Sequence, residues 1–99
     1  MSGFRNIKIP IQFGRWSAWY DLQSYIGKNK YTISFEFLDS TQESPFEVQV
    51  RYMTPKGLKM ASAIGPGQYT IEGEGAGTDT IRIRSLSALF TQVTVTVPE

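Results

Sequence analysis

The sequence predicts an all-β domain, built as an antiparallel β-sandwich of about eight strands. Apolar and polar residues alternate along most of the chain, turn-forming residues separate these stretches, and no segment of ten or more residues keeps a helical period. The clearest alternation comes last, where Val93, Val95 and Val97 fall on one face of an extended chain. The intervening threonines are also β-branched, which suits a pleated surface with one dry and one wet face.

Eight segments carry this alternation, at a spacing typical of sandwiches and barrels. They are 7–13, 15–22, 31–37, 46–52, 58–64, 69–71, 81–84 and 93–97. We expect turns at 27–30 and at Thr54-Pro-Lys-Gly57, where Pro is second and Gly fourth, so that 46–53 and 58–64 form a hairpin. A polar loop at 39–45, a break at 65–67, a glycine loop at 73–77 and a connector at 85–89 separate the others.

Parity along each segment predicts which side chains form the core. We expect the apolar face of each strand to point inward, and Trp16 to join that face with Ala18, Tyr20 and Leu22. The predicted core residues are Trp16, Phe35, Phe37, Val48, Val50, Ile81, Ile83, Val93 and Val95.

The N-terminal residues 1–13 are predicted to be an edge strand or an assembly arm of the single domain 1–99. Ile7, Ile9, Ile11 and Phe13 form one apolar face, but Pro10 lacks the N–H that a central strand needs. Edge strands with an apolar face are sites of pairing between chains, so these four residues are candidate interface residues. We expect deletion of 1–13 to leave a folded domain that no longer assembles.

Composition argues against several classes of function. The 99 residues contain neither cysteine nor histidine, which removes the thiolate nucleophile and the commonest general base and metal ligand. Ten basic and nine acidic residues are interspersed, and no basic stripe typical of nucleic-acid binding is evident. Without an apolar signal segment or a membrane-length apolar run, we expect a mature protein that is made and used without secretory export.

The glycine run Gly73-Glu-Gly-Ala-Gly77 admits two ligand hypotheses. Phosphate binding is disfavoured because strands flank the run and the lysine of a phosphate loop is missing. Glu72, Glu74 and Asp79 would offer oxygen ligands to calcium, but we prefer solvated loop carboxylates that Arg82 and Arg84 partly offset. We therefore expect no catalytic residue, no metal and no cofactor.

Trp16 and Trp19 are three residues apart, which places them on opposite faces if 15–22 is a strand. Trp19 then faces outward among polar neighbours, and three interpretations stay open: cover by a nearby loop, an interface anchor, or a platform for a sugar ring. Tyr25 is a second candidate of the same type.

The order of these segments resembles small jelly-roll-like β-sandwich domains of tailed-phage virion proteins, which serve as capsid decoration proteins or as domains of tails and fibres. The resemblance runs over residues 15–97, from Arg15-Trp-Ser-Ala-Trp-Tyr-Asp-Leu22 through Tyr31-Thr-Ile-Ser-Phe-Glu-Phe37 to the closing Val-Thr strand. In those domains the hairpin often carries an Asp-Gly-x-x-Trp turn, where this chain has Pro55-Lys-Gly-Leu58. Jelly-roll-like or immunoglobulin-like topology is thus expected.

The resemblance implies a non-enzymatic structural protein of a phage virion that acts by multivalent docking, with protein partners in a homo-oligomer or a virion lattice. Neither nucleic acid nor a membrane is an expected partner. The chain is also similar to galactose-binding-type carbohydrate-binding modules. The alternative is therefore a carbohydrate-binding module that uses Trp19 and Tyr25, with a glycan as its ligand.

Overall fold

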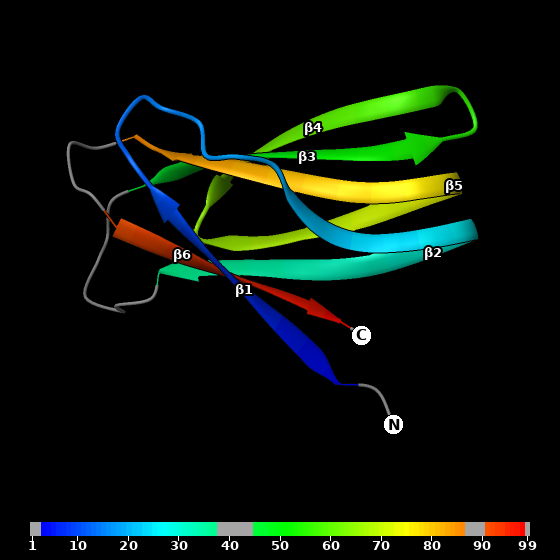
Figure 1. Cartoon of the computed structure of the whole chain (residues 1–99), viewed down its shortest axis with the longest axis horizontal. Helices are drawn as coiled ribbons and strands as arrows, with labels where there is room; N and C mark the ends of the chain where they lie inside the picture. Colours follow the sequence, from blue (N-terminus) through cyan, green and yellow to red (C-terminus); the bar gives the residue numbers. More distant parts are fainter. Residues whose placement is uncertain (1–2, 38–44, 87–90, 99) are drawn as a thin grey trace.

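The all-β prediction is confirmed by the computed structural model, which describes residues 3–37, 45–86 and 91–98. One antiparallel sheet contains six strands in the order β1-β6-β2-β5-β3-β4 (Figure 1). Within these residues there is no helix long and apolar enough to cross a membrane. The strands are β1 (Phe4–Ile11), β2 (Tyr20–Phe37), β3 (Phe46–Thr54), β4 (Gly57–Gly65), β5 (Gly67–Ser85) and β6 (Thr91–Pro98).

The prediction of about eight strands is wrong because two pairs of predicted strands are continuous. The expected turn at 27–30 lies inside β2, and the expected glycine loop at 73–77 lies inside β5. These two segments pair with each other, Gly27 opposite Gly75 and Asn29 opposite Gly73. Gly27 and Gly75 have φ angles of 93° and 119°, which glycine adopts without steric cost. Two turn-like sequences therefore continue the ladder instead of ending it.

Both long strands bend sharply in this region, so the sheet folds back on itself (Figure 1). One half contains β1, β6, the second part of β2 and the first part of β5. The other half contains the first part of β2, the second part of β5, β3 and β4. The expected separation into distinct sheets is not observed, because β2 and β5 run through both halves.

The two halves enclose one hydrophobic core. Phe35 of the first half and Phe46 of the second meet edge-to-face, with ring centroids 6.0 Å apart. The predicted core residues Phe35, Val48, Val50, Ile81, Ile83, Val93 and Val95 are all buried, as predicted. The side chain of Phe37 lies outside the described residues. The core also takes in Ile9, Ile11, Leu22, Tyr31, Ile33, Phe46, Tyr52, Ile71 and Val97.

Trp16 is a wrong core prediction, because the predicted strand 15–22 begins only at Tyr20. Residues 16–19 form an irregular connection that runs beside β5 and leaves Trp16 half-buried. Ser17 fastens this connection twice: its N–H donates to the carbonyl of Ile83 at 2.9 Å, and its Oγ accepts the Ile83 N–H at 3.1 Å. Those bonds take the place of a regular ladder.

The hairpin of β3 and β4 is confirmed. Thr54 and Gly57 are paired across a turn, where Thr54 Oγ1 donates to the Gly57 carbonyl at 2.8 Å and accepts the Lys56 N–H at 3.3 Å.

The position of β1 is also as predicted: among the described strands it pairs only with β6, at one edge of the sheet. Its Pro10 therefore has an edge position, which tolerates the missing N–H.

A candidate interaction surface

Three arginines and two tryptophans form a ladder on the outer side of β3 and β5. The guanidinium carbon of Arg82 lies 4.5 Å from the ring centroid of Trp16 and 4.7 Å from that of Trp19. Arg84 adds a contact of 4.6 Å to Trp16, and Arg51 one of 4.3 Å to Trp19. We call these five residues the Arg–Trp ladder. Each ring contacts two guanidinium groups, and Arg82 links the two rings.

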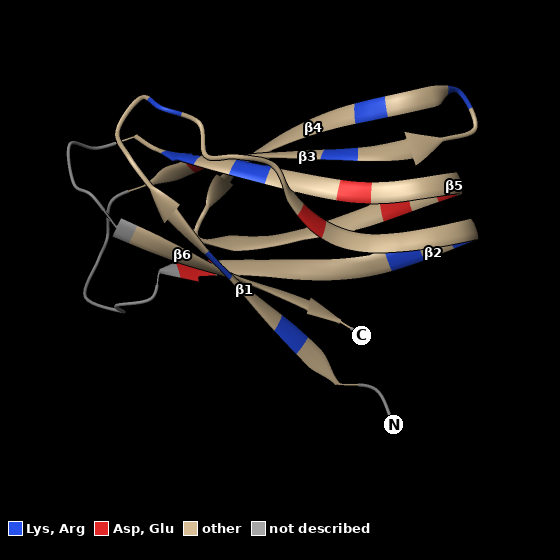
Figure 2. Cartoon of the chain, in the orientation of Figure 1, with Lys and Arg blue, Asp and Glu red and all other residues tan. Residues whose placement is uncertain are grey.

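The pleat and the register bring the arginines together. Arg82 and Arg84 alternate with the buried Ile81 and Ile83, so both point away from the core. On β3, Arg51 occupies the same outer face two residues beyond Gln49, the register partner of Arg82. The sequence analysis considered neighbours along the chain, whereas strand pairing brings three arginines of two strands together on this face. Figure 2 shows Lys and Arg positions next to each other on the neighbouring strands β3 and β5.

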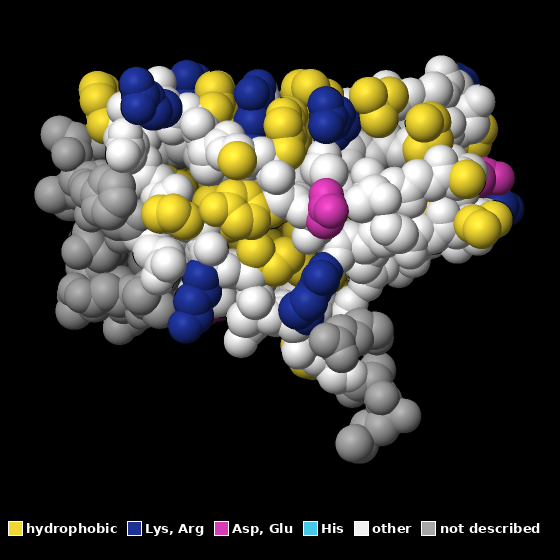
Figure 3. Space-filling model, in the orientation of Figure 1, with side chains coloured by type: hydrophobic (Ala, Val, Ile, Leu, Met, Phe, Trp, Pro, Cys, Tyr) yellow, Lys and Arg dark blue, Asp and Glu magenta, His cyan; other side chains and the backbone are white. Residues whose placement is uncertain are grey.

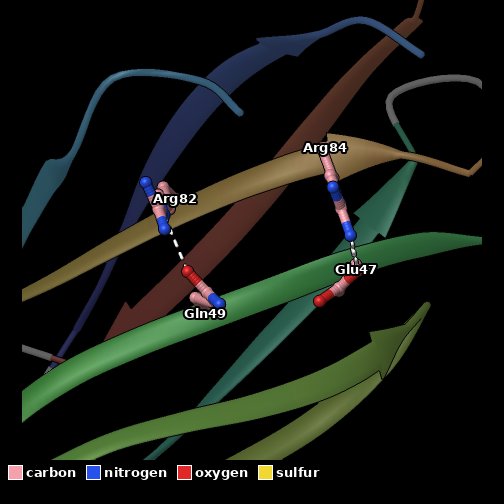
Figure 4. Close-up of polar contacts among 4 residues, drawn as sticks. All are labelled: Glu47, Gln49, Arg82 and Arg84. Carbon is pink, nitrogen blue, oxygen red and sulfur yellow. Dashed lines mark hydrogen bonds and ion pairs between the residues drawn. The ribbon is translucent and has the colours of Figure 1, made fainter. Parts of the chain in front are cut away.

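The ladder arginines have different polar partners. Arg84 pairs with Glu47, with Nη2 at 2.7 Å and Nε at 3.1 Å from the same carboxylate oxygen (Figure 4). Arg82 Nε donates to Gln49 Oε1 at 2.7 Å, a neutral partner. Among the described residues neither Arg51 nor Arg82 has an ion-pair partner, so this face keeps positive charge.

The predicted opposite placement of the tryptophans is wrong, because 16–19 is not a strand and both rings join one ladder. Trp19 is half-buried, and the guanidinium groups of Arg51 and Arg82 from the neighbouring strands lie over its ring. Tyr25 is half-buried too, with its hydroxyl 3.3 Å from both the N–H and the carbonyl of Met53. Trp19 and Tyr25 thus have different neighbours and do not form a common platform.

The N-terminal candidates divide into buried and accessible side chains. Ile9 and Ile11 are fully buried in the core, and Ile7 is half-buried against it. Phe13 is 62% exposed beyond the end of β1. The face of Ile7, Ile9 and Ile11 is thus covered mainly by the chain itself, which leaves Phe13 and the free edge of β1 as accessible parts of this segment.

The opposite edge of the sheet carries an apolar surface that the sequence analysis did not identify. Leu58, Met60 and Ile64 of β4 are 61%, 51% and 61% exposed. They share one face of the strand with Ser62, while the alternate residues, among them both alanines, point to the other. Figure 3 shows hydrophobic side chains alternating with Lys and Arg along this side of the molecule. The sequence feature that could have identified this surface is the alternation of large apolar residues with the two alanines, which places the large residues together on the opposite face of the strand.

The acidic residues near the glycine run do not gather. Asp79 is fully buried and accepts a 2.6 Å hydrogen bond from the Tyr31 hydroxyl, so the expectation of a solvated loop carboxylate is wrong for this residue. Burial raises the pKa of Asp79 above its ordinary value, and the same carboxyl helps burial to raise the pKa of Tyr31. Glu72 pairs with Lys30 at 3.2 Å at the surface. In the described part of the chain no three acidic side chains are placed to hold a metal.

A hollow of about 240 Å³ lies beside the ladder. Pro10, Gln12, Arg15, Trp16 and Ser17 line it, so it joins the end of β1 to the connection that bears the tryptophans. Its lining combines one aromatic ring, one cation and hydrogen-bonding groups. The arrangement offers contacts to a small polar ligand or to a side chain of a partner.

Comparison with protein-family models, characterised proteins and solved structures gave no match to this chain. The surface chemistry and the strand order are therefore the basis for a functional proposal.

Proposed function

We propose that this chain is a non-enzymatic interaction protein, a subunit of a larger assembly of the kind found in tailed-phage virions, as a capsid decoration or tail component. It acts by shape-complementary docking to protein partners, repeated over many copies. The observation that carries the proposal is the apolar β4 edge, where three large side chains are more than half exposed on a strand that pairs on one side only among the described residues. Such edges are the parts of a sheet most prone to pair with another chain.

The strand order supports a jelly-roll interpretation of the fold. When β2 and β5 are each divided at their bend, one layer has the order β1, β6, second β2, first β5, and the other has first β2, second β5, β3, β4. That gives eight strand segments in two four-stranded layers, as in jelly rolls, which recur in viral capsids and in lectins. The fold interpretation is thus compatible with the virion role and with the carbohydrate alternative.

The carbohydrate alternative has one favourable observation, the hollow beside Trp16 with its polar lining. The rings of Trp16 and Trp19 are less suitable as stacking platforms, because guanidinium groups lie within 5 Å of both centroids. A sugar ring would have to displace cation–π contacts, each worth about 0.5–1 kcal/mol at an exposed site. Docking to protein is therefore the preferred function.

Quantitative detection of this chain in density-gradient-purified virus particles tests the proposal. The expected result is a fixed copy number per particle, retained after a high-salt wash, because apolar contacts persist when surface charges are screened. Glycan-array binding of the purified chain, together with its absence from particles, would support the carbohydrate module and overturn the virion role.

A further inference from the structure

The two edges of the sheet differ in how well they could receive another strand. On β1 the exposed residues include Arg5, Lys8 and Pro10, which are the features that protect natural sheet edges from pairing. On β4 the one charged residue is Lys59, and the strand has no proline. In the described structure β4 is the terminal strand and pairs only with β3. The β4 edge therefore has less of the usual protection than the β1 edge.

The sequence of β4 is self-complementary about its centre. It reads Gly-Leu-Lys-Met-Ala-Ser-Ala-Ile-Gly from Gly57 to Gly65, with Ala61 in the middle. In an antiparallel pair of two copies centred on Ala61, Leu58 lies opposite Ile64 of the second copy and Met60 opposite Ser62. The terminal glycines also lie opposite each other. In every opposed pair, an even-numbered residue faces an even-numbered one or an odd-numbered residue faces an odd-numbered one. The register therefore satisfies the alternation of hydrogen-bonded and non-hydrogen-bonded pairs in an antiparallel ladder.

The charges of β3 and β4 fit the same register. Lys59 lies opposite Ala63 of the second copy, so the two lysines do not face each other. Across β3, Ile64 pairs with Glu47 and Met60 pairs with Arg51. Residues that lie opposite one another across neighbouring strands form a cross-strand row. In the paired copies, the row that contains Glu47 of one chain is next to the row that contains Arg51 of the other chain. The register thus avoids like charges directly opposite each other, an arrangement that destabilises sheets.

We propose that the β4 edge is a homotypic interface, at which a second copy of this chain pairs antiparallel about Ala61 to join two sheets into one continuous sheet. The pairing places the exposed Leu58 beside Ile64 of the second copy on one continuous outer face, and it satisfies the free backbone groups of β4. It rests on the proposed function, because it names the partner at one of the two edges. A twofold axis makes the contact isologous, so a single surface serves both copies.

Cysteine cross-linking tests the register directly, because the chain contains no cysteine of its own. An Ala61→Cys variant is expected to form a disulfide-linked dimer on mild oxidation, since opposed Cβ atoms lie about 5 Å apart. Lys59→Cys is the matched control on the same face of β4. Its two copies would be four residues apart along the strands, about 13 Å, which is beyond disulfide reach. Circular dichroism of both variants checks that they are folded.

A second pair of variants tests the interface without cross-linking. Ile64→Lys is expected to weaken dimerisation roughly tenfold or more, because each copy loses the apolar cross-strand contact with Leu58 of the other. Ile26→Lys changes an isoleucine that is 92% exposed on β2 and should leave the dimer intact. Sedimentation equilibrium measures both. Equal cross-linking of the Lys59→Cys and Ala61→Cys variants, or equal dimerisation of the two lysine variants, would overturn the β4 interface.

The outcomes separate this inference from the proposed function. If the chain is present in virus particles but Ala61→Cys does not cross-link, the β4 pairing is wrong and the docking role stands. If the chain is monomeric and absent from particles, both fail.

Discussion

Replacement of Arg82 by methionine is the perturbation that best tests the Arg–Trp ladder. Methionine keeps much of the aliphatic stem but removes the guanidinium group, and with it two contacts to tryptophan rings and the 2.7 Å hydrogen bond to Gln49. Two half-exposed cation–π contacts at about 0.5–1 kcal/mol each, plus about 1 kcal/mol for the hydrogen bond, give a loss of about 2–3 kcal/mol in the free energy of unfolding.

The two tryptophans of the chain both belong to the ladder, so their fluorescence follows its loss in urea denaturation. Arg82→Lys is the matched control for charge. It keeps the cation but not the planar group that stacks on a ring, so it should recover less than half of the loss. A destabilisation below about 0.5 kcal/mol, the usual size of a neutral surface change, would refute the ladder as a stabilising element. Full recovery by lysine would refute the stacking argument and leave only a charge effect.

The buried residues support three further predictions. Phe35→Ala should cost about 3–5 kcal/mol in denaturant melts because Phe35 is fully buried and packs on Phe46; a cost below about 1 kcal/mol would refute the register of β2. Burial raises the pKa of Asp79, so above the ordinary carboxyl pKa the folded state binds more protons than the unfolded state, and stability should fall as the pH rises from there. Asp79→Asn should remove this fall in melts recorded from about pH 4 upward, and an unchanged pH profile would contradict it. Deletion of residues 1–13 removes the buried Ile9 and Ile11, whose burial contributes about 3–6 kcal/mol together to the free energy of unfolding. The deletion should therefore abolish cooperative unfolding. A native-like melt of the truncated chain would instead support the sequence-based expectation of a folded, assembly-deficient fragment.

Period-two alternation predicted most of the core because it reports directly which side chains face inward. It identified Val48 and Val50 on β3 and Ile81 and Ile83 on β5, where both strands are paired and one face is dry. It failed at Trp16, because the connection 16–19 follows β5 through bonds made by Ser17 and has no strand period of its own.

Local sequence predicted a change of direction at the two segments that form the bend, but not that the sheet continues through them. Segments 27–30 and 73–77 each carry residues typical of turns, and the ladder continues through them because they pair with each other from distant parts of the chain. The Arg–Trp ladder could not be predicted from the sequence for a similar reason. Arg51 and Arg82 are 31 residues apart in sequence and meet only through the register of β3 and β5. Non-local pairing therefore determined both the strand number and the composition of the candidate surface.

The molar mass of the full chain in solution, measured by sedimentation equilibrium over a wide range of concentration, tests the central claim most directly. A docking subunit with an open, apolar β4 edge should show reversible association, with a mass that rises from one copy towards two or more as concentration increases. A mass that stays at the 11.1 kDa of a single chain at every concentration would contradict a self-assembling subunit.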